Sequence, residues 1–473
     1  MNNSIEFPFL KSALTLSNPF NSIQDIHEWI IKKNKEINVV LTQITFQQLE
    51  NWNFNYDAGI LAHETGGFFS IVGIKVRTNW GEKREWEQPI INQPEIGYLG
   101  IITKEFDGVL YFLLQAKIEP GNVNHVQLSP TLQATKSNYS QLHKGKKPSY
   151  LNYFQDADKS QILLDQLQSE QGARFLKKRN RNIIIKIEDD ITVYDNFIWL
   201  SLGQIKALLK YDNLINMDTR TVISGIPFGS YDNKSINIDG LLKNTEITNN
   251  FNYNLLTSTI HNDYSYQSFT EILNWLTGLK SKYELEINAI SLFDITDWRI
   301  DQDSIHHKEN KYFTVIPTKI EIGNREVQHW CQPLIQPMQK GIIAFIIKEI
   351  NGVYHFLVQA KLECGNFDIL EMAPTVQCIT GSYENSTEVP FLDYILKIKP
   401  KQIRYDSVQS EEGGRFFREQ NRNLIIEADV DFPLEIPDNY IWVTYSQLSV
   451  FIKFNNFLNI QARSIFSLIS FLD

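Results

Sequence analysis

Few cysteines, no long apolar run and no excess of positive charge set the first limits on this chain. Its 473 residues include three cysteines, and no two of them form a CxxC pair, so we expect neither a zinc site nor a disulfide framework. The longest apolar runs, such as GIIAFII, are too short to span a bilayer, and the first residues show no secretory leader. These absences favour a cytoplasmic protein that does not cross a membrane.

The charge balance argues against a further class. The formal net charge of −10 disfavours a nucleic-acid surface, since affinity for a phosphate backbone comes mainly from clustered Lys and Arg. It leaves room for one small anionic ligand held by a few local cations. The sequence also lacks a GxGxxG motif after an apolar strand, so no nicotinamide-binding fold is indicated, and we expect no cofactor and no metal.

The chain contains a set of sequence motifs, called phrases below, each of which occurs once in either half. QAKIEPGN begins at Gln115 and QAKLECGN at Gln359, and WEQPII and PTLQAT of the first half return as WCQPLI and PTVQCI at the same offset. QSEQGARF is answered by QSEEGGRF after a shift of three residues. Ordered matches at so long a period indicate duplication of one domain rather than a solenoid. We predict domains at 1–225 and 265–473, joined by an Asn-rich and Ser-rich connector at 226–264.

Each half is predicted to be an α+β domain with a mostly antiparallel sheet packed with helices. Asp-Gly and Asn-Gly separate apolar runs in YLGIITKEFDGVLYFLLQAKIE and GIIAFIIKEINGVYHFLVQAKLE, which predicts two hairpins with two-residue turns. Nearly every position of these strands is apolar, so both sheet faces should be covered. Helical spacing of apolar residues recurs near 20–34, 202–210, 268–280 and 446–453.

The repeated phrase places polar side chains on one face of a strand end. Because side chains alternate along a strand, Gln115, Lys117 and Glu119 should point the same way, as should Lys361 and Glu363 in the second copy. One interpretation is a solvated strand end. The other is a ligand pocket opening on the sheet, in which Gly-Asn lets the backbone approach closely. Recurrence of the same polar types favours the pocket.

Three further features allow both a structural and a functional interpretation. The segment SPTLQATKSNYSQLHKG is dense in hydroxyl and amide groups, which suit either sugar and phosphate binding or a loop of local turns. QSEQGARF and QSEEGGRF either begin a helix capped by Ser169 and Ser410, or present Arg174 and Arg415 to a diphosphate. His63 has a histidine at the matching place in the second half and is either structural or a base.

Long phrases in both halves carry a resemblance to a known family. They are HETGGFFSIVGIKV, QPIINQPEIGYLGII, DGVLYFLLQAKIEPGNVNHVQLSPTLQATKSNY, SEQGARF and KRNRN, followed by GVYHFLVQAKLECGN, EMAPTVQC and QSEEGGRFF. Together they resemble the NDP-hexose 2,3-dehydratases of deoxysugar biosynthesis over nearly the whole chain. The resemblance implies a tandem pair of Nudix-like domains assembled as a homodimer. SEEGGR faintly resembles the end of a Nudix box, but the full spacing of acids that would hold magnesium is missing.

The resemblance also implies a substrate and a reaction. The substrate would be a dTDP-4-keto-6-deoxyhexose, and the product a 3,4-diketo-2,6-dideoxy sugar nucleotide that passes to an NAD(P)H-dependent 3-ketoreductase. The C4 ketone acidifies the C3 hydrogen because the resulting carbanion is an enolate. A general base removes that proton, and a general acid helps the C2 hydroxyl leave as water. No hydride moves, and the oxyanion needs only a nearby Lys, Tyr or backbone N–H.

By family position, the resemblance implies roles for particular residues. The candidate catalytic groups are Lys361, Glu363, Lys117, Glu119, His63 and His143. The candidate substrate contacts are Trp52, Ser137, Asn138, Tyr139, Ser140, Gln141, Arg174, Trp298, Thr375, Val376, Gln377, Tyr383, Glu411, Glu412, Gly413, Gly414 and Arg415. Trp52 and Trp298 would stack on the nucleobase, with a place in the core as their alternative. One copy or both could catalyse.

Two other functions stay open at this point. A Nudix-like sugar-diphosphate hydrolase would need magnesium and would release a nucleoside monophosphate. A non-catalytic nucleotide-sugar-binding protein would bind its ligand without turnover. The presence of Lys, Glu and Arg at matched positions in both copies favours an enzyme over the binding protein.

Overall fold

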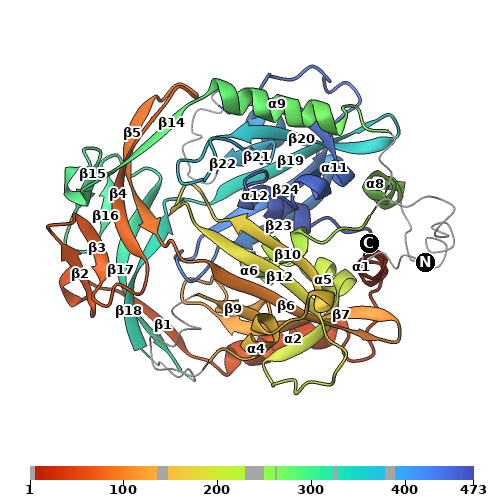
Figure 1. The fold of residues 1–473 in the computed structure, drawn as a ribbon, viewed down its shortest axis with the longest axis horizontal. Helices are drawn as coiled ribbons and strands as arrows, with labels where there is room; N and C mark the ends of the chain where they lie inside the picture. The colour runs from red at the N-terminus through yellow and green to blue at the C-terminus, as the bar shows by residue number, and fades with distance from the viewer. Residues whose placement is uncertain are drawn as a thin grey trace.

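The strands of the protein form two large and two small sheets. The computed structural model describes residues 6–135, 147–229, 250–260, 264–323, 329–378 and 389–472, and all statements below concern these residues. In Figure 1 the two large sheets occupy the centre and right of the molecule, and the small sheets lie together at the left. Within the described residues, no helix is both long and apolar enough to cross a membrane.

The first large sheet comes from the first half of the chain. Its order is β10-β12-β6-β7-β13, with β8 beside β7 and β9 beside β6. Only the β12–β6 pair is parallel among these pairings. The strands are β6 (Gly97–Phe106), β7 (Val109–Ile118), β8 (Val126–Ser129), β9 (Leu132–Ala134), β10 (Ile162–Ser169), β12 (Arg179–Lys186) and β13 (Phe197–Ser201).

The second large sheet repeats this topology with the second half. Its order is β23-β24-β19-β20-β25, with β21 beside β20 and β22 beside β19, and again one parallel pair, β19–β24. The strands are β19 (Gly341–Ile350), β20 (Val353–Lys361), β21 (Glu371–Ala373), β22 (Val376–Cys378), β23 (Ile403–Ser410), β24 (Gln420–Glu427) and β25 (Tyr440–Thr444). The predicted α+β class with antiparallel-rich sheets is confirmed.

Both predicted hairpin turns are present. Asp107 and Gly108 have φ of 50° and 73° between β6 and β7, and Asn351 and Gly352 have φ of 55° and 82° between β19 and β20. Positive φ at both central residues is what a type I′ turn requires, and Asp, Asn and Gly tolerate it best. The turns fix the register of the two strands that lead into the repeated phrases.

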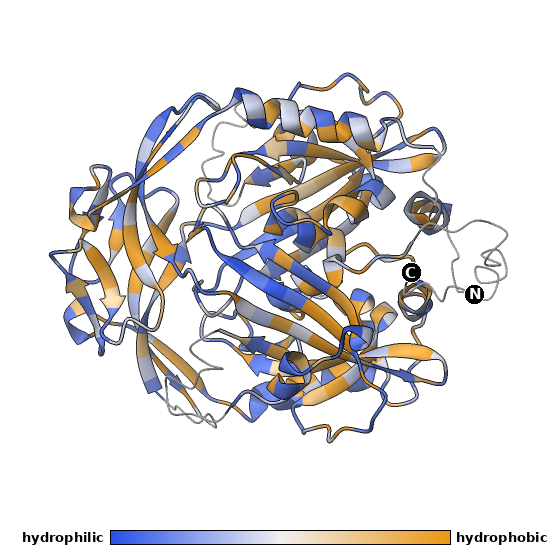
Figure 2. Ribbon diagram, viewed as in Figure 1, coloured by the Kyte–Doolittle hydropathy of each residue, from blue (hydrophilic) through white to orange (hydrophobic). Residues whose placement is uncertain are grey.

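Helices cover both faces of each large sheet, as the apolar strands predicted. Leu113 of β7 packs with Leu151 and Phe154 on the outer face, whereas Phe112 joins a core shared by both large sheets. Figure 2 shows that the strands of both large sheets are mostly hydrophobic, and it also shows hydrophilic residues along β10 at the centre of the molecule. The helices are α1 (Glu6–Ala13), α2 (Ile23–Lys35), α4 (Leu151–Gln155), α5 (Leu202–Leu208), α6 (Met217–Ser224), α8 (Asn250–Ile260), α9 (Phe269–Lys282), α10 (Leu392–Leu396), α11 (Tyr445–Phe451) and α12 (Ile460–Ser467), with single 3-10 turns η1 (Phe46–Gln48), η2 (Lys159–Gln161), η3 (Leu292–Asp294) and η5 (Pro400–Gln402).

The four helices predicted from apolar spacing correspond to α2, α5, α9 and α11. The segment expected to be a connector, 226–264, contains α8, which packs against β20. Residues 170–174 and 411–415 form turns rather than a helix, because Ser169 and Ser410 end the strands β10 and β23. The helix-capping interpretation of QSEQGARF and QSEEGGRF is therefore wrong.

The two small sheets exchange a strand between the halves. β1 of the first half pairs with β17 of the second half, and β14 of the second half pairs with β4 of the first. Figure 1 shows β14 beside the small-sheet strands of the first half, and its partner β4 lies between β14 and β5. The small-sheet strands are β1 (Val39–Gln43), β2 (Trp52–Asn55), β3 (Ile60–His63), β4 (Ser70–Thr78), β5 (Glu85–Asn92), β11 (Phe175–Leu176), β14 (Leu285–Ile290), β15 (Trp298–Ile300), β16 (Ile305–His307), β17 (Phe313–Ile322) and β18 (His329–Pro337).

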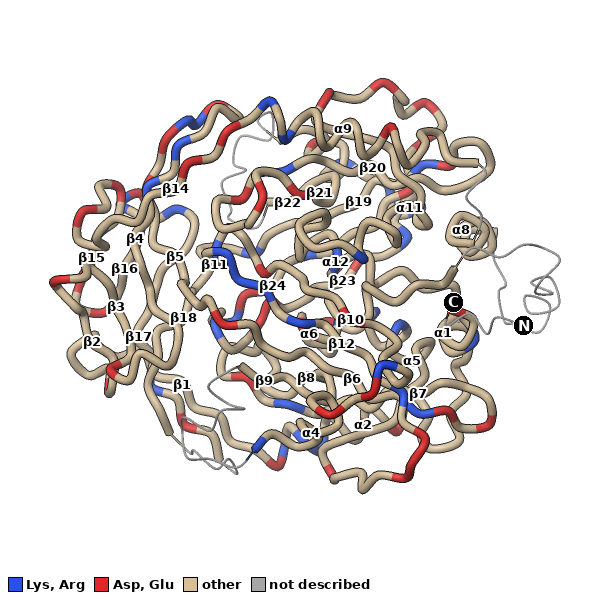
Figure 3. The backbone as a smooth tube through the Cα atoms, viewed as in Figure 1, with Lys and Arg blue, Asp and Glu red and all other residues tan. Residues whose placement is uncertain are grey.

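The exchange interlocks the halves through backbone hydrogen bonds. β14 follows β4 over six residues, from Leu285 opposite Thr78 to Ile290 opposite Gly73. Charges of both signs alternate along β4, β5 and β14 in Figure 3, and Lys75 and Arg77 both contact Glu85 at 2.7 and 2.8 Å. Exposed pairs of this kind add little stability, so the exchange is held mainly by the ladder and by the apolar side chains beneath it.

Candidate active site

The two kinds of repeated phrase meet each other across the halves. The Gly121 N–H donates to Gly413 O at 2.7 Å, so QAKIEPGN contacts QSEEGGRF. Reciprocally, the Gly365 N–H donates to Gly172 O at 2.6 Å, so QAKLECGN contacts QSEQGARF. A Cβ on Gly121 would lie 1.7 Å from Phe416 O, which explains why the phrase needs glycine there. We call the first meeting point site I and the second site II.

Site I is organised around Glu119. Its carboxylate accepts a hydrogen bond from Gln133 Nε2 at 2.5 Å and one from the Gly413 N–H at 3.1 Å, and Lys117 Nζ lies 3.7 Å away. Glu119 is only 4% exposed. Both Lys117 and Glu119 continue the face of β7 that carries Leu113, beneath α4. Of the one-faced row predicted from the phrase, Glu119 is thus buried, whereas Gln115 and Lys117 are half-buried.

Two more carboxyl groups belong to site I, Asp218 on α6 and Glu412 beside Gly413. Burial raises the pKa of Asp218 well above its usual range, and the charges of Glu119, Glu170 and Glu412 raise it further. Burial likewise raises the pKa of Glu412 to about 8, with the charge of Glu119 next in importance. Desolvation and nearby like charges thus disfavour the anion of both groups, and Glu412 holds a proton at neutral pH.

Site II has the same backbone arrangement as site I but different ionisable side chains. Gln377 Nε2 donates to Glu363 at 2.8 Å, as Gln133 does to Glu119. The matched phrases, however, place Gln461 where site I has Asp218, and Gln171 where site I has Glu412. Gln171 is satisfied by Glu411, to which it donates at 2.7 Å. Burial raises the pKa of Glu363, and Lys361 opposes that shift.

A pair of buried arginines fixes the two sites relative to each other. Arg220 on α6 donates to Ser410 O and to Ser464 Oγ, and Arg463 on α12 donates to Ser169 O and to Thr221 Oγ1. Each guanidinium therefore joins a helix of one half to the strand that precedes the SEQG or SEEG turn of the other. Burial lowers the pKa of each arginine to about 10, so both stay charged at neutral pH.

The phrase arginines also cross between halves. Arg415 lies 4.3 Å from the ring centroid of Phe69 and donates to Gln93 Oε1 at 3.2 Å, next to Glu412 in site I. Arg174 lies 4.2 Å from the centroid of Phe313 and is 2% exposed. Cation–π contacts of this geometry orient a guanidinium without consuming all its donors. Arg415 is the more accessible of the two.

Trp52, Trp298 and His63 lie in the small sheets, not beside Lys117 or Lys361. Trp52 and Trp298 are 3% and 6% exposed and pack on Phe69 and Phe313 in one apolar cluster. The His63 ring meets the edge of Trp52, and its Nδ1 lies 2.9 Å from Thr65 Oγ1. A nucleobase would reach either indole only after neighbouring side chains moved, so the stacking role stays a prediction.

The remaining predicted contacts divide into interior residues and residues outside the described ranges. Thr375 Oγ1 donates to Leu357 O at 2.5 Å and accepts from the Ile346 N–H, and Val376 lies in the apolar cluster under α10. These two side chains hold strands together, whereas Gln377 reaches Glu363. Predicted contacts and one predicted base outside the described residues are Ser137, Asn138, Tyr139, Ser140, Gln141, His143 and Tyr383.

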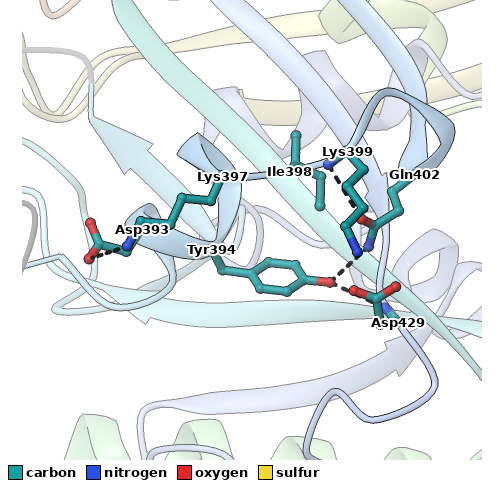
Figure 4. Close-up of a pocket in the computed structure, with 7 residues that line it drawn as sticks. All are labelled: Asp393, Tyr394, Lys397, Ile398, Lys399, Gln402 and Asp429. Atoms are coloured by element: carbon teal, nitrogen blue, oxygen red, sulfur yellow. Dashed lines mark hydrogen bonds and ion pairs between the residues drawn. The ribbon is translucent and has the colours of Figure 1, made fainter.

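Open grooves elsewhere on the surface contain none of the predicted residues. Figure 4 shows one of about 300 Å³ beside α10, where Tyr394 OH accepts from Gln402 Nε2 at 3.1 Å and from the Asp429 N–H at 3.2 Å. Another, of about 190 Å³, lies between α8 and β23. Sites I and II are the candidates for the chemistry, because buried carboxyl groups with shifted pKa values mark functional sites better than cavity size does. No three His, Cys, Asp or Glu side chains of the described chain are arranged to hold a metal ion.

Asp218 is the residue of site I that sequence reasoning missed. The signal was available, because NMDTR at 216–220 and NIQAR at 459–463 are a further pair of matched phrases, with Asp against Gln at the third place. The helix itself carries polar residues at most positions, and such a helix is normally assigned to the surface. In the structure all of α6 is buried between the two halves.

The arrangement defines a duplicated α+β protein with two related clusters of carboxyl groups, and comparisons with known proteins identify its family. The family model described as NDP-hexose 2,3-dehydratase matches residues 23–226 and 269–469, and the chain belongs to this family. The dTDP-4-dehydro-6-deoxy-alpha-D-glucopyranose 2,3-dehydratase of Saccharopolyspora spinosa is 42% identical over 97% of this chain and 93% of its own length. The proteins of the same description from Amycolatopsis orientalis and Streptomyces violaceoruber are each 37% identical, over 97% and 93% of this chain and 92% and 95% of theirs.

Proposed function

We propose that this enzyme removes water across C2 and C3 of a dTDP-4-keto-6-deoxyhexose at site I, giving the 3,4-diketo-2,6-dideoxy sugar nucleotide. The family and its three relatives support the reaction. One observation supports the choice of site: at two matched positions site I has carboxylic acids, Asp218 and Glu412, where site II has the amides Gln461 and Gln171. Amides cannot exchange protons with a substrate at neutral pH, whereas protonated acids can.

Glu119 is the proposed base. The hydrogen on C3 is adjacent to the C4 ketone, and its removal leaves a carbanion that delocalises onto the ketone oxygen as an enolate. Lys117, 3.7 Å from Glu119, would stabilise that oxygen with its positive charge. Hydrogen bonds from Gln133 and the Gly413 N–H hold the carboxylate in place.

Asp218 and Glu412 are the proposed acids. One of them gives its proton to the C2 hydroxyl as the C2–O bond breaks, so the group leaves as water and the enolate electrons form the C2–C3 double bond. The resulting enol, with its hydroxyl on C3, tautomerises by taking a proton at C2 and losing the hydroxyl proton. Arg415, beside Glu412, and the lysines of the segment between β9 and α4, Lys136, Lys144, Lys146 and Lys147, suit the diphosphate. The matching segment of the second half has two glutamates and no cation.

The deciding experiment supplies the dTDP-4-keto-6-deoxyhexose without added metal or nicotinamide and follows the mass of the sugar nucleotide. Loss of 18 Da, as expected for one water, or a reduced diketo product trapped by an added ketoreductase, is the expected result. Release of dTMP would instead indicate a sugar-diphosphate hydrolase. Unchanged ligand that nevertheless binds would indicate a non-catalytic binding protein.

The same proposal includes the setting of the enzyme. A vicinal diketone is reactive, so an NAD(P)H-dependent 3-ketoreductase acting next in the pathway suits the product. We infer a homodimer in the cytoplasm, and domains at 1–225 and 265–473 that resemble Nudix-type domains. Light scattering after size exclusion measures the dimer, for which a mass near twice 55.0 kDa is expected.

A further inference from the structure

A directed chain of hydrogen bonds runs from the start of α6 to Glu119. The Thr219 N–H donates to Asn216 Oδ1 at 2.8 Å as the N-cap bond of the helix, and Asn216 Nδ2 donates to Gln133 Oε1 at 3.2 Å. Gln133 Nε2 then donates to Glu119 at 2.5 Å. Asn216 Nδ2 also donates to Ser129 Oγ at 2.8 Å. Every donor in this chain points toward the carboxylate.

The direction of the chain follows from the helix. A backbone N–H can only donate, so the oxygen of the Asn216 amide must face Thr219 and its nitrogen must face away. That nitrogen in turn requires the oxygen of Gln133, which leaves the Gln133 nitrogen facing Glu119. Were Gln133 turned the other way, its oxygen would meet the carboxylate, and Glu119 would need a proton to make the contact.

We infer that Asn216 and Gln133 are positioning residues, which keep the Glu119 carboxylate aimed so that it can accept the C3 proton. This inference rests on the proposed function and assigns a role to two residues that do not themselves touch the substrate. Site II contains the same chain, from the Ala462 N–H to Asn459 at 2.9 Å, from Asn459 to Gln377 at 2.7 Å, and on to Glu363 at 2.8 Å. The repetition shows that this chain of hydrogen bonds is part of the structure that the two halves share.

The other charged groups around Glu119 act in both directions. Lys117 from β7 favours the carboxylate anion, whereas the anionic forms of Asp218 from α6 and Glu412 from the turn before β24 disfavour it. The amide of Gln133 and the Gly413 N–H are the neutral donors that the structure places on Glu119. Losing the correctly turned amide should therefore remove one of these neutral donors from the carboxylate.

The test is Asn216→Asp, which keeps an N-cap of equal quality but removes the amide donor. The new carboxylate attracts the Gln133 nitrogen, so the Gln133 oxygen turns to Glu119. A hydrogen bond to a charged group is lost, so the acidic limb of the pH–kcat profile should move up by about one to two pH units. On that limb the rate should fall about ten- to a hundredfold, while above it the rate should stay within a few-fold of the parent enzyme.

Asn459→Asp is the matched control, since it changes the N-cap of α12 in the same way at site II. It should leave the acidic limb where it is. A uniform fall in kcat at every pH for Asn216→Asp, or an equal shift in both variants, would overturn the inference. A carbon-13 NMR titration of Glu119, assigned by its absence in Glu119→Gln, follows its protonation without turnover. An unmoved midpoint in Asn216→Asp would contradict the role of the hydrogen-bond chain. A shifted midpoint in a protein that does not dehydrate its substrate would contradict only the proposed function.

Discussion

Sites I and II have the same backbone arrangement and differ in the positions that carry acidic side chains. In both, a Lys-x-Glu strand end meets a Gly-containing turn from the other half, and a Gln donates to the glutamate. Site I has two acids, the buried Asp218 and the half-buried Glu412, where site II has two amides. The duplication thus supplied two copies of one frame whose acids lie at different matched positions, since site II in turn has the buried acid Glu371 where site I has Gln127. Substitutions at matched positions test whether that difference decides where the chemistry takes place.

The largest effect is expected for Glu119→Gln. Removing the base should lower kcat by about 10³-fold, within the range usual for general acid–base groups, while dTDP binding stays measurable. Glu363→Gln makes the same change at site II and should cost less than about tenfold. Both are measured by the rate of water loss at saturating substrate. Equal losses at the two positions would show that both sites catalyse, and a larger loss for Glu363→Gln would reverse the assignment.

A smaller effect is expected when site I is given the side chains of site II. Asp218→Asn and Glu412→Gln should each lower kcat by about 10²-fold. The pKa of Glu412 is raised to about 8 by burial and by Glu119, so an acid of this kind loses its proton, and its activity, as the pH rises through about 8. The alkaline limb of the parent enzyme should therefore lie near that pH. In the variant that has lost the acid of the reaction, the remaining rate should no longer show the alkaline limb. An unaltered alkaline limb in both variants would exclude Asp218 and Glu412 as that acid.

The strand exchange gives a comparison of the two small sheets. Ile74 on β4 and Ile320 on β17 are fully buried isoleucines, each next to the strand that the other half donates. Ile→Ala at either position should cost about 2–5 kcal/mol in the free energy of unfolding. Because the halves are interlocked, both variants should lower one and the same cooperative transition, measured by calorimetry. Two separated transitions, with only one of them moved, would show that the halves unfold independently.

How far the sequence predicts this molecule depends on how local each feature is. The Asp107-Gly108 turn and the common face of Lys117 and Glu119 follow from dihedral preferences and strand alternation, and both are present. The exchange of β1 and β14 could not be predicted, because the sequence VVLTQ fits the edge of its own half as well as that of the other. Asp218 was missed because a buried polar helix depends on partners, such as Ser410 for Arg220, that lie in the other half.

The smallest expected effect concerns Lys206, a buried lysine with a serine, Ser449, at the matching place of the second half. Its Nζ donates to Ser467 O at 3.0 Å and Ile469 O at 2.6 Å, and burial lowers its pKa to about 7. Between pH 7 and 10 the unfolded chain holds this proton and the folded protein does not. The free energy of unfolding should therefore rise with pH, by at most about 1.4 kcal/mol per pH unit.

Lys206→Met removes this titration, so the gain in stability between pH 7.5 and 9.5, measured by urea unfolding, should shrink by the contribution of one proton. The new side chain cannot donate to the two carbonyl groups, so absolute stability at pH 9.5 should fall by about 1–3 kcal/mol. Lys210→Met, at an exposed lysine one turn further on, should leave the pH dependence as it is. An equal pH dependence of the free energy of unfolding in all three proteins would mean that Lys206 stays charged in the folded protein. The replacement of this lysine by Ser449 in the second half would then have no effect on the number of protons bound.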